Sequence, residues 1–228
     1  MTIFPGSIYG SMGRLGVGKQ TSAAVPWWLS GGISAANCIA AYQPKGAADL
    51  AASYVNLANP GTYNAAPGVA PTWDAVNGWV FDKAKQQYLS TGVNPAGTMQ
   101  QYGLIVRYSE ITVGSQILLG QRLSTTDSIC LFNDNNLFRA YSSGYGGAML
   151  STYLDGVLAV FANKFYYNGG EIGTIDNFTG NALKSDVIYV GGRVTGQYLG
   201  AKIQCAAIYN ASISAAQVAA LSAAMAAL

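Results

Sequence analysis

The chain has 228 residues, of which 50% are hydrophobic and 10% are charged, with a formal net charge of +2. No run approaches the roughly 20 apolar residues that a membrane-spanning helix needs, so membrane insertion is not expected. So weak a net charge argues against binding to nucleic acid or to a membrane surface. Twenty-eight glycines and fifteen tyrosines, with many Asn, Ser and Thr residues, are typical of short strands and turns, so we expect a mostly β protein.

Residues 1–36 are expected to form an extended N-terminal arm, ahead of one domain over residues 37–228. The arm is rich in Gly and Ser, has no acidic residue and shows no sustained periodicity, so it cannot order itself. It nevertheless carries large apolar residues that a solvated tail would not expose: Ile3, Phe4, Ile8, Tyr9, Trp27 and Trp28. Two alternatives follow, because such an arm either packs onto its own domain or reaches a neighbouring subunit.

From Cys38 onward, strand-sized runs alternate with turns, and no segment between them has the pattern of a crossover helix. This spacing predicts an antiparallel β-sandwich. A first run at 38–43 is followed by a long polar loop over 44–73. The later runs are 78–82, 86–92, 101–110, 115–121, 128–133, 137–143, 148–154, 157–169, 186–192 and 198–210.

Three turns are predicted from local sequence. Asn168-Gly169 is a strong hairpin signal between extended runs. Residues 133–136 and 154–156 are interpreted as two further hairpins. Along the run 157–169, strand alternation would place Phe161, Asn163, Phe165 and Tyr167 on one face.

The chain ends in one predicted helix. Ser214 and Gln217 have capping-box spacing. Val218, Leu221 and Met225 follow at helical spacing, which indicates a single apolar stripe. We expect this helix to close the domain and to cover an exposed edge or end of the sandwich.

Four segments, in order, resemble the concanavalin A-like lectin/glucanase superfamily in its laminin-G-like jelly-roll branch. They are "NGWVFDKAKQQYLSTG" (77–92), "FYYNGGEIG" (165–173), "IYVGG" (188–192) and "GAKIQCAAIYNASISAAQV" (200–218). The resemblance implies two curved antiparallel sheets of about six or seven strands, a fold that hosts both enzymes and binding modules. The Ala- and Ser-rich stretch 40–79 is similar to copies in bacteriophage and bacterial surface proteins.

No catalytic site is expected. The chain has no histidine, which removes the usual general base and most transition-metal sites. Retaining glucanases of the superfamily carry two glutamates flanking an aspartate on one strand. Neither Glu110 nor Glu171 has acidic residues at this spacing. Asp176 would fall on the opposite face from Glu171 in a regular strand. Cys38, Cys130 and Cys205 are widely spaced and odd in number, which favours buried free thiols over a disulfide framework.

A carbohydrate site is the remaining candidate for chemistry. Asn135 and Asn136 are natural turn residues that could contact a sugar, and Tyr141 and Tyr145 could stack on sugar faces. Tyr166 and Tyr167 are weaker candidates, since a sandwich core also needs aromatic residues. Asn133, Asp134 and Asp127 lie close in sequence, so Ca²⁺ is the one cofactor that is considered.

The sequence predicts a non-enzymatic bacteriophage virion protein, capsid-decorating or tail-associated, that assembles through its arm. Its expected partners are further copies of itself, as a homo-oligomer, and other virion proteins such as the capsid or tail. The start shows no secretory signal, so we expect synthesis in the host cytoplasm and a final location in the virion. The alternative is a carbohydrate-binding module or tail-fibre receptor-binding protein that adheres to host glycans.

Overall fold

The computed structural model describes residues 24–95, 97, 101–121, 128–135, 137–142, 145–148, 154–175, 185–193 and 196–228, with the backbone alone at 141–142 and 145–148. The strands in these ranges are β1 (Cys38–Tyr42), β2 (Ala66–Val69), β3 (Thr72–Asp74), β4 (Gly78–Phe81), β5 (Tyr88–Ser90), β6 (Gly103–Ser109), β7 (Ser115–Gln121), β8 (Ile129–Asp134), β9 (Leu137–Ser142), β10 (Tyr145–Ala148), β11 (Gly156–Phe161), β12 (Lys164–Tyr167), β13 (Gly170–Thr174), β14 (Tyr189–Val190) and β15 (Ala201–Tyr209). The helices are α1 (Leu50–Ser53), α2 (Ala215–Ala226) and the short 3-10 helices η1 (Trp27–Leu29), η2 (Ala35–Asn37) and η3 (Lys83–Lys85).

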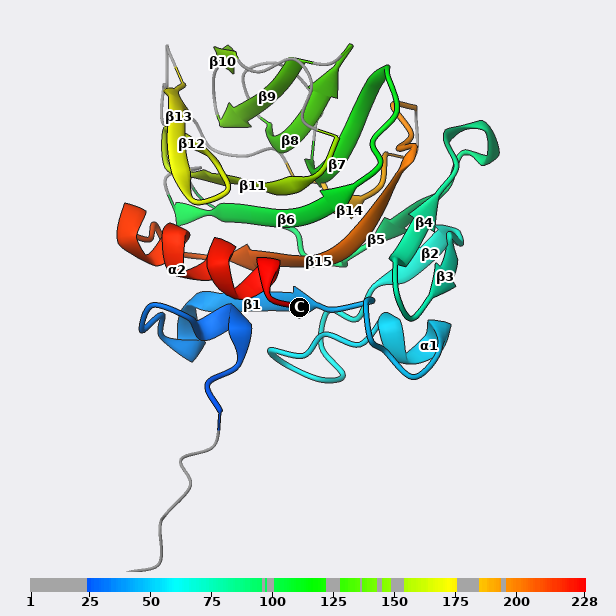
Figure 1. The fold of residues 1–228 in the computed structure, drawn as a ribbon, viewed down its shortest axis with the longest axis horizontal. Coiled ribbons are helices and arrows are strands. Elements are labelled where there is room, and N and C mark those ends of the chain that lie inside the picture. The colour runs from blue at the N-terminus through cyan, green and yellow to red at the C-terminus, as the bar shows by residue number, and fades with distance from the viewer. Residues whose placement is uncertain are drawn as a thin grey trace, which may run out of the picture.

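Two antiparallel sheets pack face to face, as Figure 1 shows. Sheet A has eight strands in the order β13-β12-β11-β6-β15-β4-β3, with β1 pairing β15 beyond the end of β4. Sheet B has seven strands in the order β10-β9-β8-β7-β14-β5-β2. The predicted all-β sandwich with one C-terminal helix is therefore confirmed.

Strand β15 lies in the middle of sheet A and is buried on both faces. Ile203 and Ile208 face sheet B and join the main core, which also holds Trp79 of β4. Cys205 and Tyr209 face the other way and are also fully buried. The sequence of a strand that is covered on both faces is apolar at nearly every position, as in "AKIQCAAIY" of β15.

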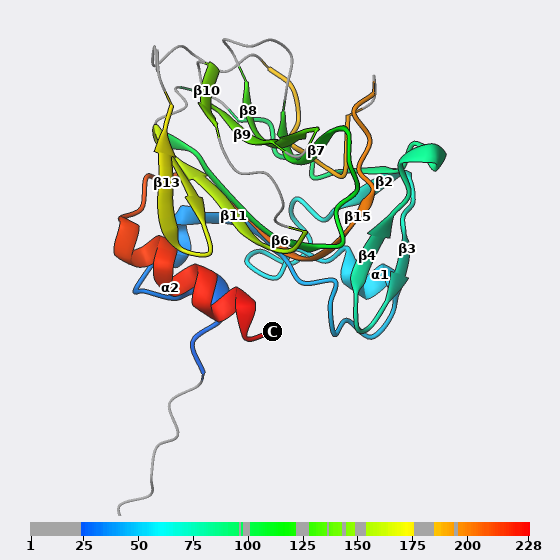
Figure 2. The same cartoon turned by 45° about the horizontal axis from the view of Figure 1, so that its top comes forward.

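A second core covers the outer face of sheet A. Helix α2 lies across this face, with Val218, Leu221 and Met225 buried against it (Figures 1 and 2). The predicted apolar stripe is confirmed, but the predicted place of the helix is wrong. It covers the face of the sheet rather than an edge or end, because the apolar outer side of β15 and its neighbours needs a cover.

The described part of the arm also belongs to this second core. Trp27 is 7% exposed, and its indole Nε1–H donates to Gln43 Oε1 at 2.9 Å. The Tyr209 hydroxyl donates to the carbonyl oxygen of Trp28 at 2.8 Å. Residues 24–36 therefore pack onto their own domain, which is the first of the two alternatives for the arm. Ile3, Phe4, Ile8 and Tyr9 lie outside the described residues.

The start of α2 has the predicted capping box. The Ser214 side chain accepts from the Gln217 backbone N–H, and the Ser214 backbone N–H donates to Gln217 Oε1 at 2.9 Å. Two first-turn donors are satisfied in this way. The cap fixes where the chain leaves the end of β15 and turns across the sheet.

Two of the three predicted hairpins are confirmed. Asn168 and Gly169 link β12 to β13 with φ of 47° and 82°, the positive values that a type I′ turn requires. Asn135, with φ of 53°, begins the turn between β8 and β9.

The hairpin predicted at 154–156 is wrong. Strand β10 pairs with β9 in sheet B, whereas β11 pairs with β6 and β12 in sheet A, so the chain changes sheets there. The single strand predicted over 157–169 is also wrong, because Phe161 pairs with Lys164 around a tight turn that contains Ala162 at φ of 50°. Since the chain reverses there, Phe161 and Phe165 lie in different cores.

The loop predicted over 44–73 contains α1, β2 and the start of β3. The buried side chain of Asn56 ties it to β1, accepting from the Ala41 N–H at 2.9 Å and donating to the Ile39 carbonyl at 3.0 Å. The indole N–H of Trp79 donates to Ser53 Oγ at 2.7 Å. These contacts order a segment whose sequence has no strand or helix periodicity.

Cys38, Cys130 and Cys205 are free and buried, as predicted. Burial raises the pKa of the Cys38 and Cys205 thiols to about 12. Among the helices that the structure describes, none is long and apolar enough to cross a membrane.

Replacing Trp27 by Ala is expected to lower the free energy of unfolding by about 3–5 kcal/mol, the usual cost of deleting a buried Trp side chain. The matched control is Val25→Ala, at a residue that is 69% exposed, with an expected change within about 0.5 kcal/mol. Urea unfolding followed by fluorescence measures both. Equal stabilities for the two variants would show that residues 24–36 are not part of the folded domain.

The buried thiols also predict how stability depends on pH. Because their pKa is higher in the folded chain than the usual 9.0, the folded state holds its protons more tightly than the unfolded state. Their stabilising effect is complete below pH 9 and is lost as the pH rises to about 12. In urea unfolding across this range, Cys205→Ala should show a shallower decline than the parent chain. An identical decline would contradict the prediction.

Candidate functional site

The predicted asparagine site lies at an exposed turn. Asn135 is exposed, and its side-chain amide donates to Asp134 Oδ1 at 3.3 Å. Asp134 also forms an ion pair with Arg139 at 3.3 Å. Asn133 is buried and donates to the Thr112 carbonyl, so it faces away from a common ligand position. Asn136 and Asp127 lie outside the described residues, and within the described ranges no three His, Cys, Asp or Glu residues group as metal ligands.

The predicted tyrosines are not gathered at this turn. Tyr166 is 4% exposed and belongs to the second core, so its assignment as a sugar-stacking residue is wrong. The Tyr167 hydroxyl donates to the Asp155 carbonyl at 2.6 Å on sheet A. Tyr141 and Tyr145 are cross-strand partners in β9 and β10 of sheet B, and their side chains lie outside the described part.

The structure brings three other tyrosines together on the outer face of sheet B. Tyr88 lies on β5, Tyr189 on β14 and Tyr198 just before β15, and all three are partly exposed. The ring centroids of Tyr88 and Tyr189 are 5.9 Å apart in an edge-to-face arrangement, and those of Tyr88 and Tyr198 are 6.4 Å apart. We call these three residues the tyrosine patch.

Strand alternation explains why these rings face outward. Leu89 and Val190 pair across β5 and β14 and point into the main core. Their neighbours Tyr88 and Tyr189 therefore stand on the opposite face.

Two glycines let the rings lie close to the backbone. A β-carbon on Gly68 of β2 would lie 2.0 Å from the Tyr88 ring, and one on Gly192 would lie 3.0 Å from the Tyr198 ring. The rings are therefore held against the main chain, which fixes their orientation.

Polar groups border the patch where β5 ends and β14 begins. The Tyr189 hydroxyl donates to Asp186 Oδ1 at 3.4 Å, and Asn94 Nδ2 donates to Ser185 Oγ at 2.9 Å. Ser90 pairs with Tyr189 in the register and so shares its face. Aromatic rings beside carboxylate, amide and hydroxyl groups are suited to a ligand with both C–H faces and hydroxyls.

Burial, followed by the nearby Asp186 carboxylate, raises the pKa of Tyr189 above its usual 10.0. Both causes disfavour the phenolate. The Tyr189 hydroxyl therefore stays protonated and can donate a hydrogen bond.

One register row links the patch to the predicted tyrosines across sheet B. The row is Ala66, Ser90, Tyr189, Gly120, Cys130, Tyr141 and Tyr145. Three strand spacings of about 4.8 Å separate Tyr189 from Tyr141, or about 14 Å. Cys130 lies between them and is fully buried, so the patch and the predicted pair do not form one open surface.

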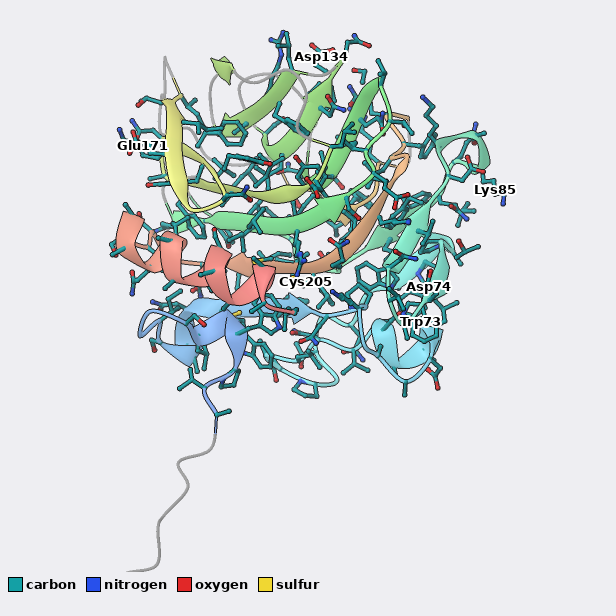
Figure 3. All side chains as sticks on the ribbon, viewed as in Figure 1. Trp73, Asp74, Lys85, Asp134, Glu171 and Cys205 are labelled. Atoms are coloured by element: carbon teal, nitrogen blue, oxygen red, sulfur yellow. The ribbon has the colours of Figure 1, made fainter. Side chains whose placement is uncertain are left out.

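The two glutamates are each paired with a lysine. Glu110, just after β6, pairs with Lys202, and Glu171 on β13 pairs with Lys164 at 2.6 Å. Figure 3 shows Glu171 at the β13 edge, away from Asp134 near the end of β8. The absence of catalysis stays a prediction.

No protein-family model matches the sequence, and no curated protein matches it. Among solved structures, a mutant of Trypanosoma rangeli sialidase with trans-sialidase activity has a TM-score of 0.56 at 17% identity, over 84% of this chain and 34% of that chain. Domain 4 of AbnA, a GH43 extracellular arabinanase of Geobacillus stearothermophilus, in complex with arabinotriose, has a TM-score of 0.51 at 17% identity, over 82% of this chain and 98% of that chain. The binding domain of botulinum neurotoxin DC, in complex with rat synaptotagmin II, has a TM-score of 0.55 at 11% identity, over 84% of this chain and 52% of that chain.

At these identities the likeness shows the fold alone, a β-sandwich as the sequence resemblance implied. The chain spans only about a third of the sialidase chain but nearly all of the arabinanase domain. No bacteriophage protein is among these three structures.

Replacing Asp186 by Asn should lower the pKa of Tyr189, because the neighbouring negative charge is removed. The pKa should still exceed 10.0, since burial remains the larger cause. A pH titration of ¹³C-labelled tyrosine rings measures it, with Tyr189→Phe identifying the signal. An unchanged pKa would show that Asp186 does not act on Tyr189.

Proposed function

We propose that the protein binds carbohydrate through the tyrosine patch, without catalysing a reaction on it. The observation that carries this proposal is the placing of Tyr88, Tyr189 and Tyr198 within 6.4 Å of a neighbouring ring on one sheet face, beside Asp186. Aromatic rings supply apolar contact for sugar C–H faces. Hydroxyl, amide and carboxylate groups at the border supply hydrogen bonds.

The similarity to domain 4 of AbnA supports the proposal. That domain was solved with arabinotriose and is covered over 98% of its length by this chain, so the shared part is the sugar-bound domain rather than a distant module. The sialidases share only a third of their length with this chain, and the enzymatic activity in their titles belongs to those proteins.

The absence of an enzymatic role is supported by the environment of the glutamates. Glu110 follows β6 and pairs with Lys202, whereas Glu171 lies on β13, three strands away in sheet A, and pairs with Lys164. In glycoside hydrolysis by two carboxylates, these groups lie about 5–10 Å apart on either side of one sugar.

The virion role stays a prediction. It rests on the resemblance and on the arm, whose residues 1–23 lie outside the described part. Assembly into a homo-oligomer, capsid or tail partners and a location in the virion belong to the same prediction. Binding to host glycans would be compatible with it, since an adhering module can be part of a particle.

Isothermal titration of the full chain against a panel that includes arabinotriose and galactose-, glucose- and mannose-based oligosaccharides tests the proposal. We expect saturable binding, reduced about tenfold in each of Tyr88→Ala and Tyr189→Ala, which corresponds to about 1.4 kcal/mol. Tyr189→Phe, which keeps the ring, should lose less.

The control is Tyr54→Ala, at a partly buried tyrosine that packs on Trp79 away from the patch. It should bind as the parent does once thermal unfolding has shown it to be folded. Failure of every glycan to bind, or equal loss in the control, would sink the proposal.

A further inference from the structure

Tyr63 has a backbone conformation that a bulky residue seldom adopts. Its φ is 57°, in the left-handed region, where a residue with a large side chain is strained. Such strain is costly and persists only where the surrounding structure fixes the chain. A glycine at this position would avoid the strain. The stability of the loop therefore does not explain why a tyrosine stands there.

Buried side chains hold the backbone on both sides of Tyr63. The hydroxyl of Tyr42 donates to the Tyr63 carbonyl at 2.6 Å. The Asn56 side-chain amide donates to the Thr62 carbonyl at 2.9 Å, and the Asn56 backbone N–H donates to Asn64 Oδ1 at 3.0 Å. Tyr42 and Asn56 are both fully buried. The loop is thus fixed from the interior, while the Tyr63 side chain is held at the surface, 43% exposed.

The Tyr63 ring lies against the chain that continues from β5, the strand of Tyr88 in the tyrosine patch. A β-carbon on Gly92, two residues beyond the end of β5, would lie 3.7 Å from Tyr63 Cδ1. The Gly92 N–H donates to Ser90 Oγ at 3.4 Å. Ser90 is in turn the cross-strand partner of Tyr189. Contacts therefore run without a break from the Tyr63 ring to the tyrosine patch.

The exposed side of β5 continues past the end of the strand. Leu89, Thr91 and Val93 are buried, and Leu89 and Val93 belong to the main core. The residues between them point away from the core, since Ser90 is partly exposed and Gly92 is exposed. The ring that contacts Gly92 therefore lies at the outer face of sheet B, the face of the tyrosine patch.

The edge strand β2 adds apolar surface beside this face. Ala66 is exposed, and it shares the face of Ser90 because the two are cross-strand partners. Val69 is likewise the partner of Tyr88, and it is 42% exposed. Apolar side chains scattered singly over a surface need no explanation, but a contiguous row of them marks a binding surface. We call this row the β5 track, which consists of Tyr88, Val69, Ser90, Ala66 and Tyr63.

The β5 track is longer than one sugar ring. The four steps from Tyr88 to Gly92 cover about 13 Å of extended chain. Two rings in contact have centroids about 4.5–7 Å apart, so one sugar ring cannot contact both Tyr88 and Tyr63, whereas a linear oligosaccharide can. No residue of the track is Asp, Glu, Lys or Arg, and Asp186 at the border of the patch would repel an anion. The ligand is therefore expected to be neutral.

We propose that Tyr63 is a further binding residue and that the ligand is a linear, neutral oligosaccharide lying along the β5 track. This rests on the proposed function, because the track extends the tyrosine patch. Rings at the two ends of the track contact different sugars of one chain, so affinity depends on the length of the chain. The fixed loop places the Tyr63 ring before the ligand arrives, which lowers the entropy lost on binding.

Isothermal titration of the full chain with mono- to tetrasaccharides of arabinose, galactose, glucose and mannose tests the proposal. We expect the affinity to rise with length in at least one series. Tyr63→Gly deletes the ring at a φ that glycine adopts freely, so the fold is kept. It should weaken binding of the tetrasaccharide about tenfold and leave binding of the shortest saccharide that binds unchanged. Tyr63→Phe, which keeps the ring, should bind the tetrasaccharide nearly as the parent does.

The matched control is Val76→Ala, at a residue that is 73% exposed in the turn between β3 and β4 of sheet A. It should leave every affinity unchanged. Binding that Tyr88→Ala weakens but that is equal for all lengths, or insensitive to Tyr63→Gly, would overturn the β5 track and leave the tyrosine patch standing. Absence of binding in every series would overturn the proposed function, and the track with it.

Discussion

The burial of β15 on both faces is the constraint on which the rest of the structure depends. Ile203 and Ile208 require sheet B on one side, while Cys205 and Tyr209 require a cover on the other. That cover is α2, held at its start by the capping box of Ser214 and completed by η1. Figure 3 shows Cys205 on the strand beneath this layer. Residues 24–36 are part of the fold for the same reason, since the second core is incomplete without Trp27.

Among the residues that the structure describes, no helix covers the outer face of sheet B at β5 and β14. The tyrosines on that face are therefore partly exposed. In the described part of the chain, the outer face of sheet A is hollowed past the end of α2 and beside β4 and β15. The tyrosine patch therefore lies where apolar cover is missing. In this account the packing that stabilises the fold also decides which surfaces remain for ligands.

Local signals in the sequence predicted the sandwich, the α2 cap and the Asn168-Gly169 turn because each depends on neighbours in the chain. The reversal at Ala162 was missed because Ala has no preference for positive φ, and the one turn-forming residue beside it, Asn163, was assigned to a continuous strand. The tyrosine patch was missed for a different reason. Tyr88 and Tyr189 meet only through the pairing of β5 with β14, which no local pattern reveals, although the alternation Tyr88-Leu89-Ser90 could have marked an outward ring.

The most direct test of the central claim is to observe the patch itself during binding, with ¹³C-labelled tyrosine rings in the full chain and the oligosaccharide panel as titrant. The account predicts that the ring signals of Tyr88, Tyr189 and Tyr198 shift together and saturate at one concentration. The fully buried rings of Tyr42 and Tyr209 should stay unchanged. Shifts confined to other tyrosines, or spread evenly over buried and exposed rings, would contradict a carbohydrate site on sheet B.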